Sequence, residues 1–169
     1  MIPIAKPYLT KDEAQSAYDS ILTGWLTQGP RVEEFEKKFC EYTGAKHAVA
    51  VSNGTAALHL ALIVAGIGAG DEVICPSMSF IATANCIKYT GAKPVFAEID
   101  PETYNIDIRH TENIITEKTK AIMIVHQIGM PADIDSFREL CKKHSLKLIE
   151  DAACAAGSVY KGNKIGSHS

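Results

Sequence analysis

From residue 47 onward, the chain alternates between short apolar stretches and segments with helical periodicity. The apolar stretches have the length and composition of buried strands, and they cover residues 47–51, 71–75, 93–99, 120–125 and 146–150. Helices are expected between them, over residues 58–65, 80–89, 108–116 and 133–144. Five such alternations favour a mostly parallel sheet covered on both faces. The expected fold class is therefore α/β, with a three-layer, mainly parallel sheet and helices on both faces.

The first 44 residues precede this alternation. Residues 1–10 contain two prolines and no periodicity, which indicates an extended arm of the kind that crosses to a partner subunit. A helix is expected over residues 11–22, because Thr10 and Glu13 have the spacing of a capping box. Gly24 should end this helix, and a second one should follow the loop at residues 25–30.

That loop combines the only tryptophan, Trp25, with Gln28 and a Gly-Pro break. Two interpretations are open: a shaped functional loop, or a turn whose tryptophan plugs the core. Residues 1–30 are expected to form an arm, a helix and this loop, and residues 31–169 the main domain.

Length and composition exclude several classes of protein. The 169 residues suffice for one domain with a real core, and 46% hydrophobic with 22% charged residues is typical of a globular protein without a membrane segment. A net charge of −3 with no basic cluster argues against nucleic acid as a partner. The amino terminus lacks the apolar core of a secretory signal, so a cytoplasmic protein is expected. Five cysteines without Cys-x-x-Cys spacing predict neither a disulfide framework nor a metal site.

Several side chains with chemical potential follow the predicted strands. Asp151 ends the last strand and precedes a run of small residues, Phe80 follows the strand at 71–75, and His126 follows the strand at 120–125. Carboxyl ends of parallel strands form the edge where open α/β sheets bind ligands. Each residue also has a simpler interpretation: Asp151 as a cap on a turn, Phe80 as a core residue, and His126 as the partner of a backbone group. Asp133 is most simply the cap of the following helix.

The turn at residues 52–57 lies between the first predicted strand and a helix. Gly54, Thr55 and Ala56 would place unpaired N–H groups at the helix amino terminus, which favours an anion such as phosphate. Ordinary capping by Asn53 or Thr55 explains the same residues without a ligand. The turn lacks the Gly-x-Gly-x-x-Gly and Walker patterns, so dinucleotide and nucleoside-triphosphate sites are disfavoured.

Five ordered segments together resemble the pyridoxal-phosphate (PLP) dependent sugar aminotransferases of the DegT/DnrJ/EryC1/StrS family. They are residues 24–30 (GWLTQGP), 52–58 (SNGTAAL), 76–85 (PSMSFIATAN), 126–133 (HQIGMPAD) and 150–153 (EDAA). The resemblance implies the large domain of a fold type I transferase, incomplete at its carboxyl end. It also implies that Gly54, Thr55 and Ala56 bind the cofactor phosphate, that Phe80 stacks on the pyridine ring, and that Asp151 pairs with the ring nitrogen. Trp25, Gln28 and His126 are the predicted substrate residues.

The implied reaction is transfer of an amino group, from glutamate, to a keto group of a nucleotide-linked sugar, as used in polysaccharide or secondary-metabolite biosynthesis. The implied assembly is a homodimer. Two departures from the family pattern matter. Cys154 stands where many members have glutamine or histidine near the ring hydroxyl, and the family's Schiff-base lysine is expected beyond Ser169. The alternatives are therefore a sugar dehydratase of the same family, and a non-catalytic fragment or interaction protein, since a chain without that lysine should be inactive alone. Lys161 and Lys164 are expected to face solvent around a hairpin turn at Gly162-Asn163.

Overall fold

The computed structural model describes residues 6–167, which form two compact units. The first comprises the chain up to Tyr42 together with His47–Ala50, and the second comprises Thr43–Lys46 and the chain from Val51 onward. These units are defined by contacts within the chain and not by function. The expected boundary between residues 1–30 and the main domain at residues 31–169 therefore stays a prediction. The expected arm lies partly outside the described residues, and residues 6–10 form neither helix nor strand.

The first unit contains two helices. Helix α1 (Lys11–Leu22) begins with the predicted capping box, in which the Asp12 amide donates to the Thr10 hydroxyl and the Thr10 amide donates to Glu13 at 2.6 Å. Gly24, with φ of +72°, ends it as expected. Helix α2 (Pro30–Thr43) begins directly after the Trp25 loop.

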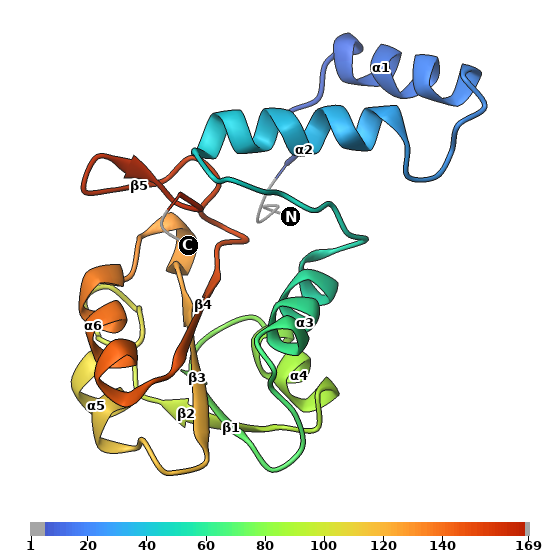
Figure 1. Ribbon diagram of the computed structural model, residues 1–169. Helices are drawn as coiled ribbons and strands as arrows, with labels where there is room; N and C mark the ends of the chain where they lie inside the picture. The colour runs from blue at the N-terminus through green and yellow to red at the C-terminus, as the bar shows by residue number, and fades with distance from the viewer. Residues whose placement is uncertain (1–5, 168–169) are drawn as a thin grey trace. The chain divides into compact units, whose positions relative to one another are not determined.

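The second unit contains a four-stranded parallel sheet with strand order β2-β1-β3-β4 (Figure 1). The strands are β1 (Glu72–Pro76), β2 (Lys93–Ala97), β3 (Thr119–Val125) and β4 (Lys147–Asp151). Helices connect them: α4 (Ala82–Tyr89), α5 (Ile108–Asn113), a 3-10 turn η1 (Gln127–Gly129) and α6 (Ile134–His144). Helix α3 (Gly54–Val64) precedes β1, and a hairpin of β5 (Val159–Tyr160) and β6 (Asn163–Lys164) follows β4. The expected parallel α/β fold is confirmed.

Alternate residues of the central strands pack into two separate apolar clusters. Val73 and Met123 face Leu62 and Ile87 from α3 and α4, whereas Ile74 and Ile122 face the other side of the sheet. On that second side they meet buried residues of α6, which are Ile134, Phe137, Leu140 and Cys141. Because successive side chains of a strand point to opposite faces, this pattern requires helices on both sides. Figure 1 shows α3 and α4 on one side of the sheet and α5 and α6 on the other.

The predicted strand at residues 47–51 is wrong, so the main sheet has four described strands rather than five. Residues 47–51 are not assigned to any strand of the described chain, and Val49 is 79% exposed. Side chains satisfy its backbone instead. The Ala50 amide donates to Glu36 at 2.7 Å, and the Ala50 carbonyl accepts from Gln28 at 3.3 Å. An apolar run becomes a strand only where a neighbour completes its hydrogen bonds.

Several other boundaries also differ from the sequence expectation. Helix α4 begins at Ala82 rather than at residue 80, so Phe80 lies in the preceding loop. Helix α5 ends at Asn113, because Ile114 packs against the core and the Thr116 amide turns to the Thr119 hydroxyl. The hairpin turn occupies Lys161-Gly162, which have φ of 48° and 87°, and not Gly162-Asn163.

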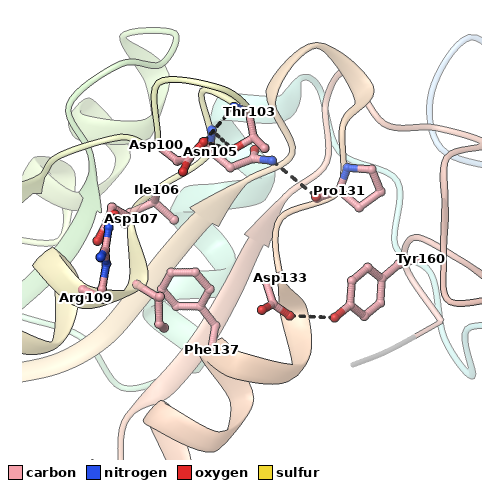
Figure 2. A pocket seen from close by; sticks show the side chains of 11 residues that line it. Asp100, Thr103, Asn105, Ile106, Asp107, Arg109, Pro131, Asp133, Phe137 and Tyr160 are labelled. Atoms are coloured by element: carbon pink, nitrogen blue, oxygen red, sulfur yellow. Dashed lines mark hydrogen bonds and ion pairs between the residues drawn. The ribbon is translucent and has the colours of Figure 1, made fainter.

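The cap of α6 makes a testable contribution to stability. Asp133 accepts from the Ser136 amide and hydroxyl. It also accepts from the Tyr160 hydroxyl at 2.8 Å (Figure 2). The Ser136 hydrogen bond, followed by that of Tyr160, lowers the pKa of Asp133 despite partial burial. The predicted capping role is confirmed.

Replacing Asp133 with alanine should lower the free energy of unfolding by about 1 kcal/mol at pH 7. A depressed folded-state pKa stabilises the fold above the unfolded value of about 3.9, and this contribution is lost as pH falls through the folded value. The difference between wild type and Asp133→Ala should therefore shrink at strongly acidic pH. Asp133→Asn keeps an acceptor but not the charge, so its stability in urea denaturation at pH 7 should lie between those of wild type and Asp133→Ala. Equal stability of the alanine variant and the wild type at pH 7 would contradict the capping role.

Candidate functional site

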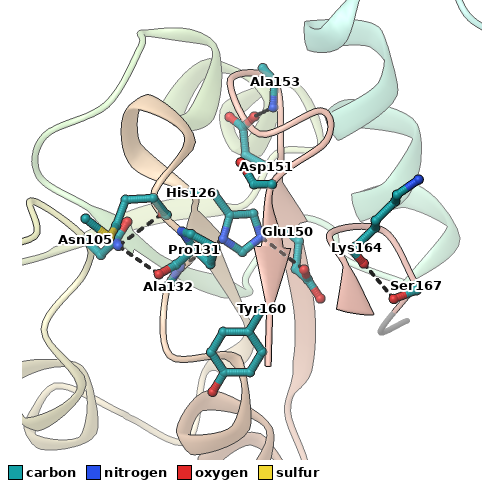
Figure 3. A network of polar contacts seen from close by, with 12 residues as sticks. Asn105, His126, Pro131, Ala132, Glu150, Asp151, Ala153, Tyr160, Lys164 and Ser167 are labelled. Carbon is teal, nitrogen blue, oxygen red and sulfur yellow. Dashed lines mark hydrogen bonds and ion pairs between the residues drawn. The ribbon is translucent and has the colours of Figure 1, made fainter. Parts of the chain in front are cut away.

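The carboxyl ends of β1, β3 and β4 lie at one edge of the sheet, as their parallel pairing requires. Asp151 is the last residue of β4, is paired in register with Val125, and is 8% exposed. One carboxylate oxygen, Oδ1, accepts from the Ala153 amide at 3.2 Å (Figure 3). The other, Oδ2, accepts from the Thr83 hydroxyl at 3.2 Å. No ion pair with Asp151 occurs within residues 6–167, so its charge is held by hydrogen bonds alone.

A buried carboxylate without a cation is costly unless a ligand completes it. Each carboxylate oxygen has two lone pairs, so Asp151 retains acceptor capacity beyond the two protein bonds. The neighbouring Cys86 adds no charge, because burial raises the pKa of its thiol to about 11. Asp151 is therefore suited to a protonated heterocyclic nitrogen, the group that the sequence led us to expect.

The amino terminus of α3 presents unpaired backbone donors. Asn53 caps the helix, since its side chain accepts from the Ala56 amide at 2.9 Å, so the Ala56 N–H is already engaged. Within the part of the chain that the structure describes, the amides of Gly54 and Thr55 have no hydrogen-bond partner. The capping interpretation is thus confirmed for Asn53, and anion binding at this turn stays a prediction. Gly54 and Thr55 are the two residues whose N–H groups are open to an anion.

Phe80 and Cys154 are exposed near the same edge. Phe80 is 76% exposed in the loop between β1 and α4, which excludes the core role for its ring within this chain. Its carbonyl accepts from the Thr83 amide at 3.1 Å, so the turn that orients Thr83 also fixes the backbone of Phe80. Cys154 is exposed in the turn that follows β4.

His126 is fully buried, and both of its ring nitrogens have partners (Figure 3). Nδ1 accepts from the Ala132 amide at 3.0 Å, so the neutral ring carries its proton on Nε2 and donates to Glu150 at 3.1 Å. This is the second sequence interpretation, in which the histidine satisfies a backbone group. A contact of His126 with substrate stays a prediction.

Hydrogen bonds from residues that were not predicted as site residues hold the loop after β3. The buried Asn105 donates to the carbonyls of Met130 and Pro131 at 3.2 and 3.3 Å, and accepts from the Gln127 amide at 3.0 Å. The Gln127 side chain donates to the Met78 carbonyl in the loop that carries Phe80. Nothing local in the sequence marks Asn105, whereas Gln127 and Thr83 lie within segments whose motifs were recognised.

Trp25 and Gln28 lie in the first unit. Trp25 is 60% exposed and donates from its ring nitrogen to the Gln28 carbonyl at 2.7 Å, so the shaped-loop interpretation applies and the core-plug interpretation does not. A Cβ atom on Gly29 would lie 2.0 Å from that ring nitrogen, which explains the glycine.

Comparison with known proteins identifies the family. A sequence model of the DegT/DnrJ/EryC1/StrS aminotransferase family matches residues 7–169. The chain belongs to this family. Among its relatives is the GDP-perosamine synthase of Caulobacter vibrioides, 48% identical over 98% of the chain and 45% of the relative.

Solved structures of similar proteins share the fold. DesV of S. venezuelae, solved in complex with a ketimine intermediate, superposes with a TM-score of 0.90 and 42% identity over 94% of this chain and 43% of DesV. Spr1654 of Streptococcus pneumoniae in its PLP form gives a TM-score of 0.93 and 35% identity over 98% of this chain and 46% of that protein. The chain thus spans less than half the length of the relatives that it matches.

Two further expectations concern absences. No helix among residues 6–167 is long and apolar enough to cross a membrane. The same residues contain no group of three or more histidine, cysteine and acidic side chains placed to hold a metal ion.

Proposed function

We propose that the complete protein containing this chain is a PLP-dependent aminotransferase that acts on a nucleotide-linked keto sugar. The observation that carries the proposal is Asp151, a buried carboxylate at the ligand-binding edge with acceptor capacity left over and no cation partner in the described chain. Membership of an aminotransferase family supports the reaction class, and the GDP-perosamine synthase relative supports a nucleotide sugar as substrate. We further propose glutamate as the amino donor, a cytoplasmic location and a homodimer.

The residues present fit the cofactor. The amides of Gly54 and Thr55 would hold the phosphate at the start of α3, and the exposed ring of Phe80 would cover the pyridine ring. Asp151 would accept a hydrogen bond from the protonated ring nitrogen. Cys154 is a weak hydrogen-bond partner, so it would hold the ring hydroxyl less firmly than glutamine does in other members.

When bound, PLP supplies an electron sink for the carbanion formed on the amino acid. The chain's own contribution is electrostatic and positional. Asp151 would keep the ring nitrogen protonated, because a buried anion favours the charged form of a nearby base. Gly54 and Thr55 would fix the other end of the cofactor, so that the ring cannot rotate away from Asp151. Trp25, Gln28 and His126 remain our proposed substrate residues.

Isotope transfer tests this function directly. The complete protein would be incubated with PLP, glutamate labelled with ¹⁵N on its amino group, and a panel of GDP- and UDP-linked keto sugars. An aminated nucleotide sugar that carries the label, detected by mass spectrometry, is the expected result. Label transfer to none of the sugars would overturn the substrate class. Formation of a dehydrated sugar instead would favour the dehydratase alternative.

The proposed dimer and the short length of the chain make a further prediction. Helix α3 exposes about half or more of Leu60, Ile63 and Val64, and strand β2 exposes Phe96. Apolar surface of this kind is normally covered by another part of the protein or by a second subunit. The 169-residue chain alone should therefore aggregate or form oligomers in light scattering, while the complete protein should be a dimer. A well-behaved monomer of the short chain would contradict this and favour an independent domain.

A further inference from the structure

The hydroxyl of Thr83 makes a buried link between the loop that carries Phe80 and the carboxylate of Asp151. Thr83 is 1% exposed, and its hydroxyl lies 3.2 Å from Oδ2 of Asp151, a residue 68 positions later in the chain. The same hydroxyl lies 2.7 Å from the hydroxyl of Ser79. Neither Thr83 nor Ser79 has been given a role by the proposed reaction.

The direction of these hydrogen bonds follows from the charge of Asp151. An ionised carboxylate can only accept, so the Thr83 hydroxyl must donate to it. Having one proton, Thr83 must then accept from Ser79. The chain of donors therefore runs from Ser79 to Thr83 to Asp151.

The backbone around Thr83 is fixed as well. Its amide donates to the Phe80 carbonyl at 3.1 Å, and its carbonyl accepts from the Cys86 thiol at 3.2 Å. The Thr83 side chain therefore has a defined position from which to orient Oδ2. The Ala153 amide fixes the other carboxylate oxygen, Oδ1. Between them, these two donors determine which lone pairs of Asp151 remain for a ligand.

We propose that Thr83 is a positioning residue, which acts through Asp151 to hold the proton on the ring nitrogen of the cofactor, and that Ser79 supports it. This inference rests on the proposed function, because it needs a protonated ring at Asp151. It adds a buried residue that would act through Asp151. Loss of the hydroxyl would leave Oδ2 without its donor and free the carboxylate to turn from the ring.

Binding of pyridoxamine phosphate to the complete protein tests the inference without relying on turnover. Thr83→Val, which replaces the hydroxyl by a methyl group, should weaken binding about tenfold in calorimetry. In a sample with ¹⁵N in the pyridine ring, the ring-nitrogen resonance should move toward that of the unprotonated ring. Thr83→Ser keeps the hydroxyl and should match wild type in both measurements. Ser79→Ala should shift both in the same direction by a smaller amount, and it serves as the test if the valine variant does not fold.

A double-mutant cycle separates positioning from general packing. In an Asp151→Asn background, Thr83→Val should change binding less than about twofold, because residues that act through one another are non-additive. The same tenfold loss in that background, or a valine variant with wild-type binding and resonance, would overturn the role of Thr83 while leaving the proposed function intact. Failure of the wild-type protein to bind pyridoxamine phosphate would overturn the proposed function as well.

Discussion

Asp151→Asn should lower the rate of amino transfer by the complete protein by roughly 10²–10³-fold, the usual effect of removing one preorganised electrostatic partner. Asparagine has nearly the same shape as aspartate, and its carbonyl can still accept from Thr83 or from the Ala153 amide. The fold should therefore persist. What disappears is the negative charge that keeps the ring nitrogen protonated. Single-turnover kinetics with labelled glutamate would measure the loss.

Asp135→Asn is a matched control for this variant. Asp135 is a half-exposed acid at the start of α6 that pairs with Lys161 on the surface, whereas Asp151 is bonded to Thr83 and Ala153. The Asp135→Asn substitution changes the net charge by the same amount as Asp151→Asn, and it should leave the rate of amino transfer unchanged. A rate for Asp151→Asn within a few-fold of wild type would remove Asp151 from the chemistry.

His126→Leu should destabilise the protein by about 3 kcal/mol, since a buried donor or acceptor left unsatisfied costs about 1–3 kcal/mol. Leucine fills the space of the ring but offers nothing to the Ala132 amide or to the Glu150 carboxylate. Trp25, the only tryptophan, lies in the first unit, so its fluorescence is a poor reporter of this change. Circular dichroism and hydrogen exchange at the Ala132 amide are better measurements.

His126→Asn keeps an acceptor close to the position of Nδ1 and should lose less stability than the leucine variant. Its Ala132 amide should remain protected from exchange, while the amide in the leucine variant should exchange faster. Equal protection of this amide in wild type and His126→Leu would show that the histidine does not hold the loop after β3.

The sequence predicts the strands that have a partner in this chain, because four apolar runs are flanked by clear turn signals. It fails at residues 47–51, since an apolar run carries no information on whether a neighbouring strand exists. Local capping at Thr10, Asn53 and Asp133 is predicted well, because donor and acceptor lie within three residues of each other.

In the candidate site, too, local features are predicted from the sequence and contacts between distant residues are not. Asp151 and the turn at Gly54 are marked by their places beside a strand and a helix. The link between Thr83 and Asp151 joins residues 68 positions apart, and the bonds of Asn105 to the loop after β3 join residues more than 20 apart. The periodicity of the sequence does not indicate which distant residues are in contact, so these pairs are seen only in the folded chain.

Successive side chains of β1 and β3 belong alternately to the two apolar clusters. This pattern also limits which insertions and deletions the protein can accept. Deleting one codon within β3 would turn Met123 and Ile122 to the wrong faces at once and would place the wrong residue opposite Asp151. A point substitution in either cluster disturbs a single side chain. Insertions and deletions should therefore be tolerated better in the loops between α3 and β1 and between α5 and β3 than inside a strand. Both loops lie at the edge of the sheet opposite Asp151.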